Sequence, residues 1–487
     1  MSWFSWSDMW VLAPVAIVAL GGAVALLIEA LLPRAAGRTS LTFAGVGTLL
    51  LGGFATVLAW AEPGVQVHGS LVTGPFAVFL GLVVLGGTAL SVLYAEGYDR
   101  AMGFDVGEYH GLKLLAAAGM LFLVAANDLV TLFIAFELMS LPVYALVAAD
   151  RRRREASEGA MKYFVLGAFA SAVLLYGFAL LYGATGTIYL HAMPAAAGAP
   201  LLKLAALALV LVGAAFKVGA VPFHAWIPDA YQGAPASVTG FMAVAVKAAA
   251  FAVLVRLLLA SGLLGKAGMD HMVVTNVLWV LALVTLIVGN VLALAQTNLK
   301  RLLAYSGIAH TGYALLGVVA AMARPEAGLA ALLYYLAAYT AMTLGAFAVL
   351  VLLATRGREL GEIEELAGLG RERPLVALGM TVCLVSLLGV PPTAGFIGKL
   401  WLFQAALEAG FTGLVVVAAL ATIVSIYYYL YPVVVMYTGT ARQPVETFAA
   451  ARLVLALAAG ATLLGGMFPG GLYDYALRGV QLLLGAA

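Results

Sequence analysis

The sequence predicts an all-α polytopic membrane protein with about 14 transmembrane helices, and two observations support this fold class. The residues are 64% hydrophobic and only 10% charged, whereas soluble domains carry charge on about a quarter of their positions. Apolar runs of roughly 20 residues recur from Met9 to Phe468, and a helix of that length crosses a hydrocarbon layer about 30 Å thick. Water is therefore not the main solvent of this chain.

A membrane-spanning β-barrel would have a different sequence pattern. Its strands need only about ten residues that alternate between apolar and polar, but stretches such as 201–221 are apolar on every side. The first apolar run, 9–32, follows Asp8 rather than a basic cluster. It is also longer than the core of a signal peptide, so we expect it to remain as the first helix.

The apolar runs give the order of the predicted spans. They cover residues 9–32, 41–60, 76–96, 112–126, 128–149, 160–183, 201–230, 236–260, 272–296, 301–322, 327–355, 375–408, 412–437 and 450–468. We expect four regions: N-terminal transmembrane helices in 1–111, a first repeat in 112–260, a second, inverted repeat in 261–440, and a C-terminal transmembrane helix in 441–487.

The basic residues test this count of spans. With the N-terminus outside, about fifteen basic residues lie in loops on one side and about four on the other, as the positive-inside rule expects. The larger group is Arg34, Arg38, Arg100, residues 151–154, Lys300, Arg301, Arg356, Arg358, Arg371, Arg373, Arg442 and Arg452, and the smaller is Lys203, Lys266, Arg324 and Arg478. Both termini then face away from the cytoplasm.

Two long apolar segments are interrupted by proline in a similar way, at residues 216–224 and 388–396. Proline lacks a backbone donor and crowds the preceding turn, so it frees carbonyl groups that lipid cannot satisfy. Corresponding segments are five spans apart, and an odd offset reverses the direction of the second copy, which is typical of inverted repeats. The alternative is two unrelated proline kinks, but each break has a lysine nearby.

Four ionisable residues lie well inside predicted spans: Glu137, Lys217, Lys247 and Lys399. Each charged side chain at a helix centre opposes insertion by about 2.5–3.5 kcal/mol, so the four together oppose it by roughly 10–14 kcal/mol. They must therefore face the interior of the bundle or a wet cavity. This pattern predicts a proton path.

Burial makes lysine a proton carrier whose charge can be switched, because it favours the neutral amine while a nearby carboxylate favours the ammonium. Glu137 moving toward or away from Lys217 would act as an electrostatic gate; the alternative is a static ion pair. Small residues flank Lys247 and permit close helix packing, so it is a candidate for the centre of the path. Lys399 follows the second proline break by about two turns and is a candidate for its exit.

Three further residues are secondary candidates. Lys162 lies inside a span but near the basic cluster 151–154, so it is either functional or a lysine that extends to the membrane interface. His224 follows Lys217 by seven residues, nearly on one helical face, and His310 lies within another span. A neutral imidazole both donates and accepts, as a proton relay requires, although a buried histidine can equally be held in place by hydrogen bonds.

Several other chemistries are excluded for this chain alone. Its one cysteine, Cys383, cannot build a disulfide, a zinc site or an iron–sulfur cluster. No glycine-rich phosphate loop follows a strand. The formal net charge of +2 gives no argument for nucleic acid as a partner. We therefore expect no cofactor and no metal in this chain.

These residues resemble a known family, the antiporter-like membrane subunits of respiratory complex I, which are related to subunits of multi-subunit sodium/proton antiporters. The resemblance covers most of the chain. It depends on the motifs 136–142 around Glu137, 221–231 after Lys217, 300–306, and 391–399 ending at Lys399. Of the family's subunit types, one has glutamate at the position of Lys399 and another continues into a long lateral helix, which leaves a third type for this chain.

The resemblance implies a fold of about 14 helices with two inverted five-helix repeats. It implies that Glu137 and Lys217 are a coupled pair, Lys247 a central relay and Lys399 the exit-side lysine. The implied function is proton pumping driven by electron transfer from NADH to quinone.

The resemblance also implies that NAD, FMN, iron–sulfur clusters and quinone belong to partner subunits, among them homologous antiporter-like subunits. It places the chain in the bacterial inner membrane. The alternative function is that of a subunit of a multi-subunit cation/proton antiporter.

Overall fold

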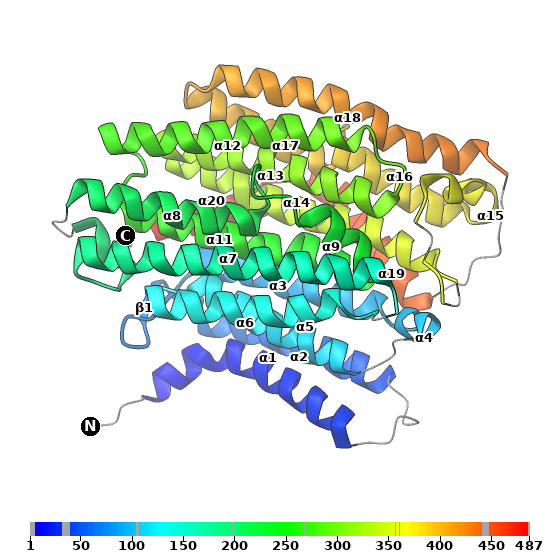
Figure 1. Ribbon diagram of the computed structural model, residues 1–487, viewed down its shortest axis with the longest axis horizontal. Coiled ribbons are helices and arrows are strands. Elements are labelled where there is room, and N and C mark those ends of the chain that lie inside the picture. The colour runs from blue at the N-terminus through cyan, green and yellow to red at the C-terminus, as the bar shows by residue number, and fades with distance from the viewer. Residues whose placement is uncertain are drawn as a thin grey trace.

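The computed structural model describes residues 5–31, 39–103, 107–150, 152–195, 199–266, 268–355, 357–359, 361–440 and 448–485 of the 487-residue chain. Helices dominate these residues (Figure 1). Thirteen described helices are long and apolar enough to cross a membrane, and Pro374–Leu388 is a shorter apolar helix. The predicted fold class is confirmed. Arg34, Arg38, Arg151, Arg356 and Arg442, which the topology argument used, lie outside the described residues.

The first half of the chain contains the elements α1 (Trp6–Leu31), α2 (Thr39–Ala59), β1 (Gly64–Gln66), β2 (Leu71–Thr73), α3 (Pro75–Tyr94), α4 (Tyr98–Met102), α5 (Glu108–Ala125), α6 (Leu129–Val147), α7 (Arg154–Thr185), η1 (Leu190–Ala195), α8 (Pro200–Val218), α9 (Ile227–Gly233), α10 (Ala236–Phe241), η2 (Met242–Val246) and α11 (Lys247–Ser261). Of these, η1 is a 3₁₀ helix and η2 is a π-helix. The segment α10–η2–α11 runs as one helix from Ala236 to Ser261.

The second half contains α12 (Met269–Ala293), α13 (Leu299–Ala323), α14 (Pro325–Leu352), η3 (Ile363–Leu366), α15 (Leu369–Glu372), α16 (Pro374–Leu388), α17 (Ala394–Glu408), α18 (Thr412–Thr438), α19 (Ala449–Met467) and α20 (Gly470–Gly485). Where spans were predicted, helices are present. The predicted span 375–408 is the pair α16 and α17, and the predicted span 201–230 is the pair α8 and α9.

Both predicted breaks are present. Gly219 ends α8 with φ 79° and Gly389 ends α16 with φ 93°, a left-handed conformation that glycine adopts without a steric penalty. The prolines follow directly, at Pro222 and at Pro391 and Pro392, where no regular helix can continue. Each break therefore opens a long helix and exposes backbone groups inside the bundle.

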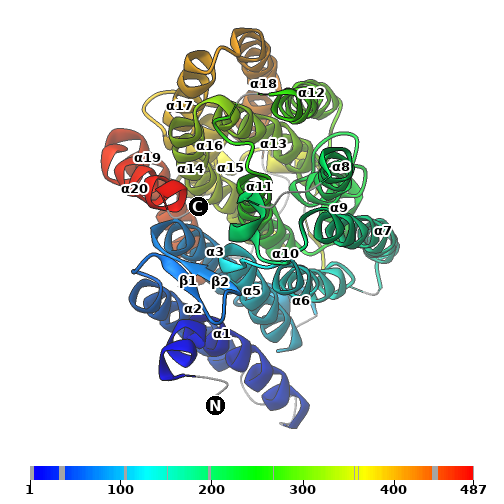
Figure 2. The ribbon, with the colours of Figure 1, turned by 90° about the vertical axis from the view of Figure 1, so that its left-hand side faces the viewer.

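The centre of the bundle lies around α10–α11, α13 and α14, whose residues are almost entirely buried. Viewed nearly along the helices, α1 and α2 lie on one side and α12 and α18 on the other (Figure 2). The peripheral helices expose large apolar side chains such as Phe169 on α7 and Ile423 on α18. Such a surface suits contact with lipid, and it leaves the central helices to carry polar groups.

Two features were not predicted. Strands β1 and β2 form an antiparallel hairpin with Val65 opposite Val72, too short to produce a recognisable alternation. Helix α20 follows α19 and packs against α3 and α14, so the predicted C-terminal region contains two helices instead of one.

The two ends of the bundle differ in charge. We call the end that carries Arg153, Lys300 and Arg301 the basic end; these side chains pair there with Glu359 and Asp229. The hairpin β1–β2 lies at the opposite end, beside His191 and the C-terminal part of α11. The positive-inside rule predicts that the basic end faces the cytoplasm.

Candidate proton-transfer site

Lys217 lies in the last turn of α8 and is 3% exposed. Its Nζ is 4.8 Å from the ring centroid of Phe136 and 5.3 Å from those of Tyr144 and Tyr163. The amine has no hydrogen-bond partner among the described residues. The rings and the negative end of the α8 dipole both favour a positive charge here, but no acceptor fixes the proton.

Glu137 lies on α6, next to the Phe136 ring that contacts Lys217. It is half-buried, and its Oε1 has no hydrogen-bond partner among the described residues. The carboxylate is close enough to act electrostatically on Lys217, but the two side chains do not form a hydrogen bond. These two described side chains therefore form no static ion pair, and the electrostatic gate stays a prediction.

Lys247 follows the π-helix η2, and its side chain is 5% exposed. Its Nζ donates to Thr311 Oγ1 at 3.0 Å and to the Gly307 carbonyl. The Thr311 hydroxyl in turn donates to the Val218 carbonyl at 2.7 Å, directly after Lys217 in sequence. One hydroxyl on α13 thus connects Lys247 to the first helix break.

His310 is buried on the same helix, one residue before Thr311. Its Nε2 lies 3.0 Å from the Tyr429 hydroxyl and its Nδ1 forms a hydrogen bond with Tyr335. Its ring centroid is 5.0 Å from that of Tyr339, the ring that Lys247 Nζ approaches at 5.0 Å. The imidazole therefore continues the path away from Lys247.

Lys399 lies on α17 beyond the second break and is 4% exposed. Its Nζ donates to the Leu388 carbonyl, the last residue of α16, at 2.8 Å. It also lies 4.4 Å from the centroid of Tyr313, whose ring is 5.9 Å from that of His310. His310 is thus placed between the surroundings of Lys247 and those of Lys399.

The remaining two candidates form no side-chain hydrogen bond to this row among the described residues. His224 is in the first break, half-buried, and its Nδ1 has no hydrogen-bond partner among the described residues. Lys162 is exposed and pairs with Glu158 and Asp229, each at 2.7 Å. Its position matches the alternative that it extends to the interface, and the relay role of both residues stays a prediction.

The hydroxyl groups between the amines were not predicted from the sequence. Thr311, Tyr313, Tyr335, Tyr339 and Tyr429 are all buried, yet threonine and tyrosine are common in membrane helices and give no charge signal. One pattern was available: Tyr335 and Tyr339 are four residues apart, and His310 and Tyr313 three, so each pair shares a helical face.

The described residues contain no group of three or more histidine, cysteine, aspartate or glutamate side chains that could hold a metal ion. What they do contain is a row of amines, an imidazole and hydroxyls that crosses both helix breaks. Such groups exchange protons without a change of redox state. The arrangement suits proton transfer along the bundle.

Comparison with known proteins agrees with this chemistry. Residues 126–425 match the family described as NADH:quinone oxidoreductase/Mrp antiporter, TM. NADH-quinone oxidoreductase subunit N of Myxococcus xanthus is 42% identical, with 96% of each chain covered. The subunit of the same name from Trichlorobacter lovleyi is 38% identical, with 97% of each chain covered.

Solved structures give the same result. A chain of respiratory complex I from Thermus thermophilus with bound aureothin superposes with a TM-score of 0.81 and 36% identity, covering 95% of this chain and 98% of that one. A chain of the Mrp complex from Dietzia superposes with a TM-score of 0.81 at 23% identity, covering 97% and 99%, which shows a shared fold. The chain belongs to the NADH:quinone oxidoreductase/Mrp antiporter family of membrane subunits, among the N subunits.

Proposed function

We propose that this chain is the N subunit of a bacterial NADH-quinone oxidoreductase and moves protons across the inner membrane while partner subunits transfer electrons from NADH to quinone. NAD, FMN, iron–sulfur clusters and quinone would then be bound by those partners. Other antiporter-like subunits would be its neighbours within the membrane. The relatives at 38–42% identity over nearly their whole length support this assignment.

The observation that supports proton transfer most directly is the row of polar groups through the two breaks. It begins at the first break, where the Val218 carbonyl next to Lys217 accepts from Thr311, and continues from Thr311 to Lys247 and then past His310 to Lys399. Within it, Glu137 controls the charge on Lys217, Lys247 relays the proton in the centre, and Lys399 releases it on the exit side. No hydrogen bond from the described residues fixes the Lys217 amine, so a change in the field of Glu137 can decide whether it holds a proton.

The test uses the whole complex in inverted membrane vesicles. We expect Lys217→Ala and Lys399→Ala each to lower NADH-driven quinone reduction and acidification together, by about a hundredfold, the lower end of what positioned acid–base groups contribute. The matched control is Lys266→Ala, because that lysine is exposed in the loop between α11 and α12 and is not a candidate for the path. An unchanged number of protons moved per electron, at unchanged rates in both variants, would contradict the proposal.

A second candidate function is exchange of sodium or potassium for protons within an antiporter complex. The shared family with Mrp antiporters favours it. The two functions differ in whether the partner subunits of this chain carry out redox chemistry. We expect a tagged chain, extracted in mild detergent, to co-purify with NADH oxidation by a quinone analogue. Cation-dependent proton flux from the purified chain alone would favour the antiporter instead.

A further inference from the structure

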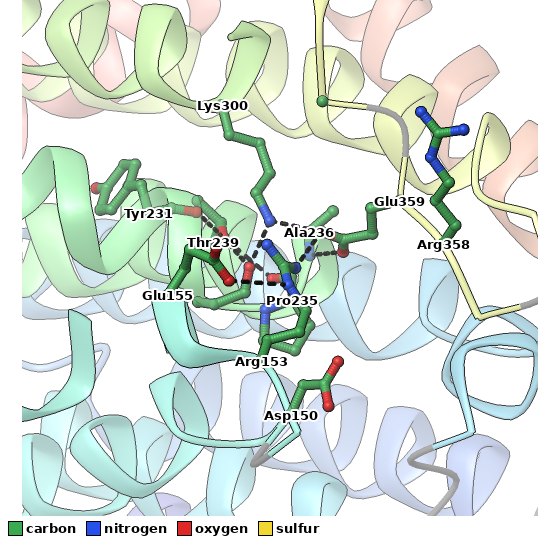
Figure 3. A network of polar contacts seen from close by, with 12 residues as sticks. Asp150, Arg153, Glu155, Tyr231, Pro235, Ala236, Thr239, Lys300, Arg358 and Glu359 are labelled. Atoms are coloured by element: carbon green, nitrogen blue, oxygen red, sulfur yellow. Dashed lines mark hydrogen bonds and ion pairs between the residues drawn. The ribbon is translucent and has the colours of Figure 1, made fainter. Parts of the chain in front are cut away.

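A buried acid–amine pair lies at the basic end, outside the row of lysines (Figure 3). Glu359 comes from the loop between α14 and η3, and Lys300 is the second residue of α13. Lys300 Nζ lies 2.6 Å from Glu359 Oε2, and the side chains are only 4% and 7% exposed. Removing two charges from water is costly even when they pair, so stability alone is a weak reason for such a pair.

Glu359 contacts the beginning of the helix that carries Lys247. Its Oε1 accepts a hydrogen bond at 2.7 Å from the backbone N–H of Ala236, the first residue of α10, and another from the Tyr98 hydroxyl. Lys300 donates to the Ala234 carbonyl at 2.6 Å, just before that helix begins. A carboxylate is favourable at a helix N-terminus, so its charge acts on α10 as well as on Lys300.

A second set of buried ionisable groups holds the next residue of the same helix. The Ser237 hydroxyl donates to Asp99 Oδ1 at 3.2 Å, and Lys113 Nζ donates to the Ser237 carbonyl at 3.2 Å. The first turn of α10 is thus surrounded by charged side chains from α4, α5, α13 and the loop after α14. Buried ionisable groups cluster at functional sites. The start of α10 is therefore a candidate functional site.

The pair is connected both outward and inward. Toward solvent, Arg153 NH1 lies 3.5 Å from Glu359 Oε2 while its side chain is 34% exposed. Inward, Lys300 and Gly307 are seven residues apart on α13, about 10 Å along the axis, and the Gly307 carbonyl accepts from Lys247. In Figure 3, Thr239 lies beside Lys300, and the Tyr231 ring lies on the side of Lys300 away from Glu359. Tyr231 interacts electrostatically with Tyr339, the ring whose centroid is 5.0 Å from Lys247 Nζ.

We infer that Glu359 and Lys300 admit protons from the cytoplasmic side and supply them to Lys247; this inference rests on the proposed role of Lys247 as relay. A proton from solution binds the Glu359 carboxylate, which removes the counter-charge of Lys300. Lys300 then releases its own proton inward, along the hydroxyl groups, to the neutral amine of Lys247. Lys300 regains a proton from Glu359, so the pair returns to its first state and Lys247 has gained one proton.

The surroundings of Glu359 suit this step. Burial raises the pKa of its carboxyl to about 7, against the opposing effect of the Ala236 N–H, so protonation occurs near neutral pH. The charged and titratable groups that face it are Lys300, Arg153 and Tyr98. The protonated fraction falls as the cytoplasmic pH rises through about 7. The rate of proton admission should fall over the same range.

The first test is Lys300→Arg in the assembled complex, followed by NADH-driven acidification of inverted vesicles. Arginine keeps the positive charge and the ion pair but does not release a proton near neutral pH. We expect normal assembly with acidification lowered about a hundredfold. Acidification at the wild-type rate would assign the pair a purely structural role and overturn the inference.

The second test is Glu359→Gln, with Glu362→Gln in the same loop as its control because that carboxylate is exposed. We expect Glu359→Gln to slow acidification and remove its dependence on pH near 7, which a packing defect would not do. An equal loss at every pH would overturn the inference, as would failure of both Lys300→Arg and Glu359→Gln to assemble.

Lys247→Met in the same vesicles tests the relay role of Lys247 separately from the admission role of Glu359 and Lys300. If Lys247→Met keeps full acidification, the proposed relay role is wrong and the admission pair fails with it. If Lys247→Met loses acidification while Lys300→Arg keeps it, the relay role stands and only the admission pair is wrong.

Discussion

Both helix breaks have a lysine nearby, but only at the second break does the lysine bind a backbone carbonyl that the break frees. At the first break, the Phe216 carbonyl accepts from the Trp226 indole at 3.2 Å and the Val218 carbonyl from Thr311. Lys217 is therefore not needed to satisfy the break, and its amine forms no hydrogen bond within the part of the chain that the structure describes. At the second break the lysine itself fills this need, because Lys399 donates to the Leu388 carbonyl.

This difference indicates how a proline break can serve two purposes. Where other side chains satisfy the freed carbonyls, a buried amine is left to respond to a distant charge. Where the amine satisfies a carbonyl, it also becomes part of the structure, and each loss of its proton weakens a hydrogen bond that holds the break. The protonation of Lys217 can therefore respond to the charge of Glu137. Proton release from Lys399 would instead weaken its hydrogen bond to Leu388 and so affect the end of α16.

The largest effect should come from the close packing of the second break. A Cβ on Gly395 would lie 1.9 Å from the Ser386 carbonyl oxygen, which is backbone and cannot move aside. A Cβ on Gly219, at the first break, would meet only the flexible end of Ile227, although φ 79° adds strain. We expect Gly395→Ala to destabilise by about 4–5 kcal/mol or more and Gly219→Ala by about 1–3 kcal/mol.

The amount of assembled complex in membranes measures this difference, with Gly47→Ala as a control because a Cβ there meets nothing within 4 Å. Equal assembly of Gly395→Ala and Gly219→Ala would show that the two breaks are equally tolerant.

The next effect separates the two lysines. Lys399→Met removes a charged hydrogen bond from the Leu388 carbonyl and should lower thermal stability by about 1.5–3 kcal/mol. Lys217→Met replaces an amine that has no hydrogen bond to any described residue, so loss of the ring contacts and relief of charge burial should nearly cancel, within about 1 kcal/mol. Thermal denaturation of the detergent-purified complex tests this order. The comparison fails if Lys217→Met is the less stable variant.

A smaller effect is expected at Thr311, which satisfies the first break. Thr311→Val keeps the volume but removes the donor to Val218 and the acceptor for Lys247, a loss of about 1 kcal/mol with slower acidification. Thr340→Val is the matched control, since that buried hydroxyl donates to the Leu336 carbonyl of its own helix. Equal acidification in both variants would remove Thr311 from the path.

The sequence was sufficient to predict the spans, the two breaks and the four central ionisable residues. Prolines and charges within apolar runs are local signals, because the membrane makes each of them costly wherever the chain folds. Glu137, Lys217, Lys247 and Lys399 could be singled out for that reason. Their roles remain predictions, although the structure brings the three lysines and His310 into one row.

The groups that connect these residues could not be predicted in the same way. Thr311 matters because α13 passes both Val218 and Lys247, a fact of tertiary packing. Lys300 and Glu359 lie at a helix end and in a loop, where charged residues are ordinary, and only the fold shows that both are buried. The hairpin β1–β2 and helix α20 were missed because short elements give weak periodicity.

The π-helix Met242–Val246 has a consequence for comparing relatives of this chain. A π turn holds one residue more than the α-helix around it, and each residue turns an α-helix by about 100°. A relative lacking this extra residue would present the start of its helix about 100° away when aligned by the lysine at position 247. A one-residue gap at this point in a sequence alignment therefore indicates that the start of the helix is rotated. Residues before the gap and residues after it should be aligned with a relative separately.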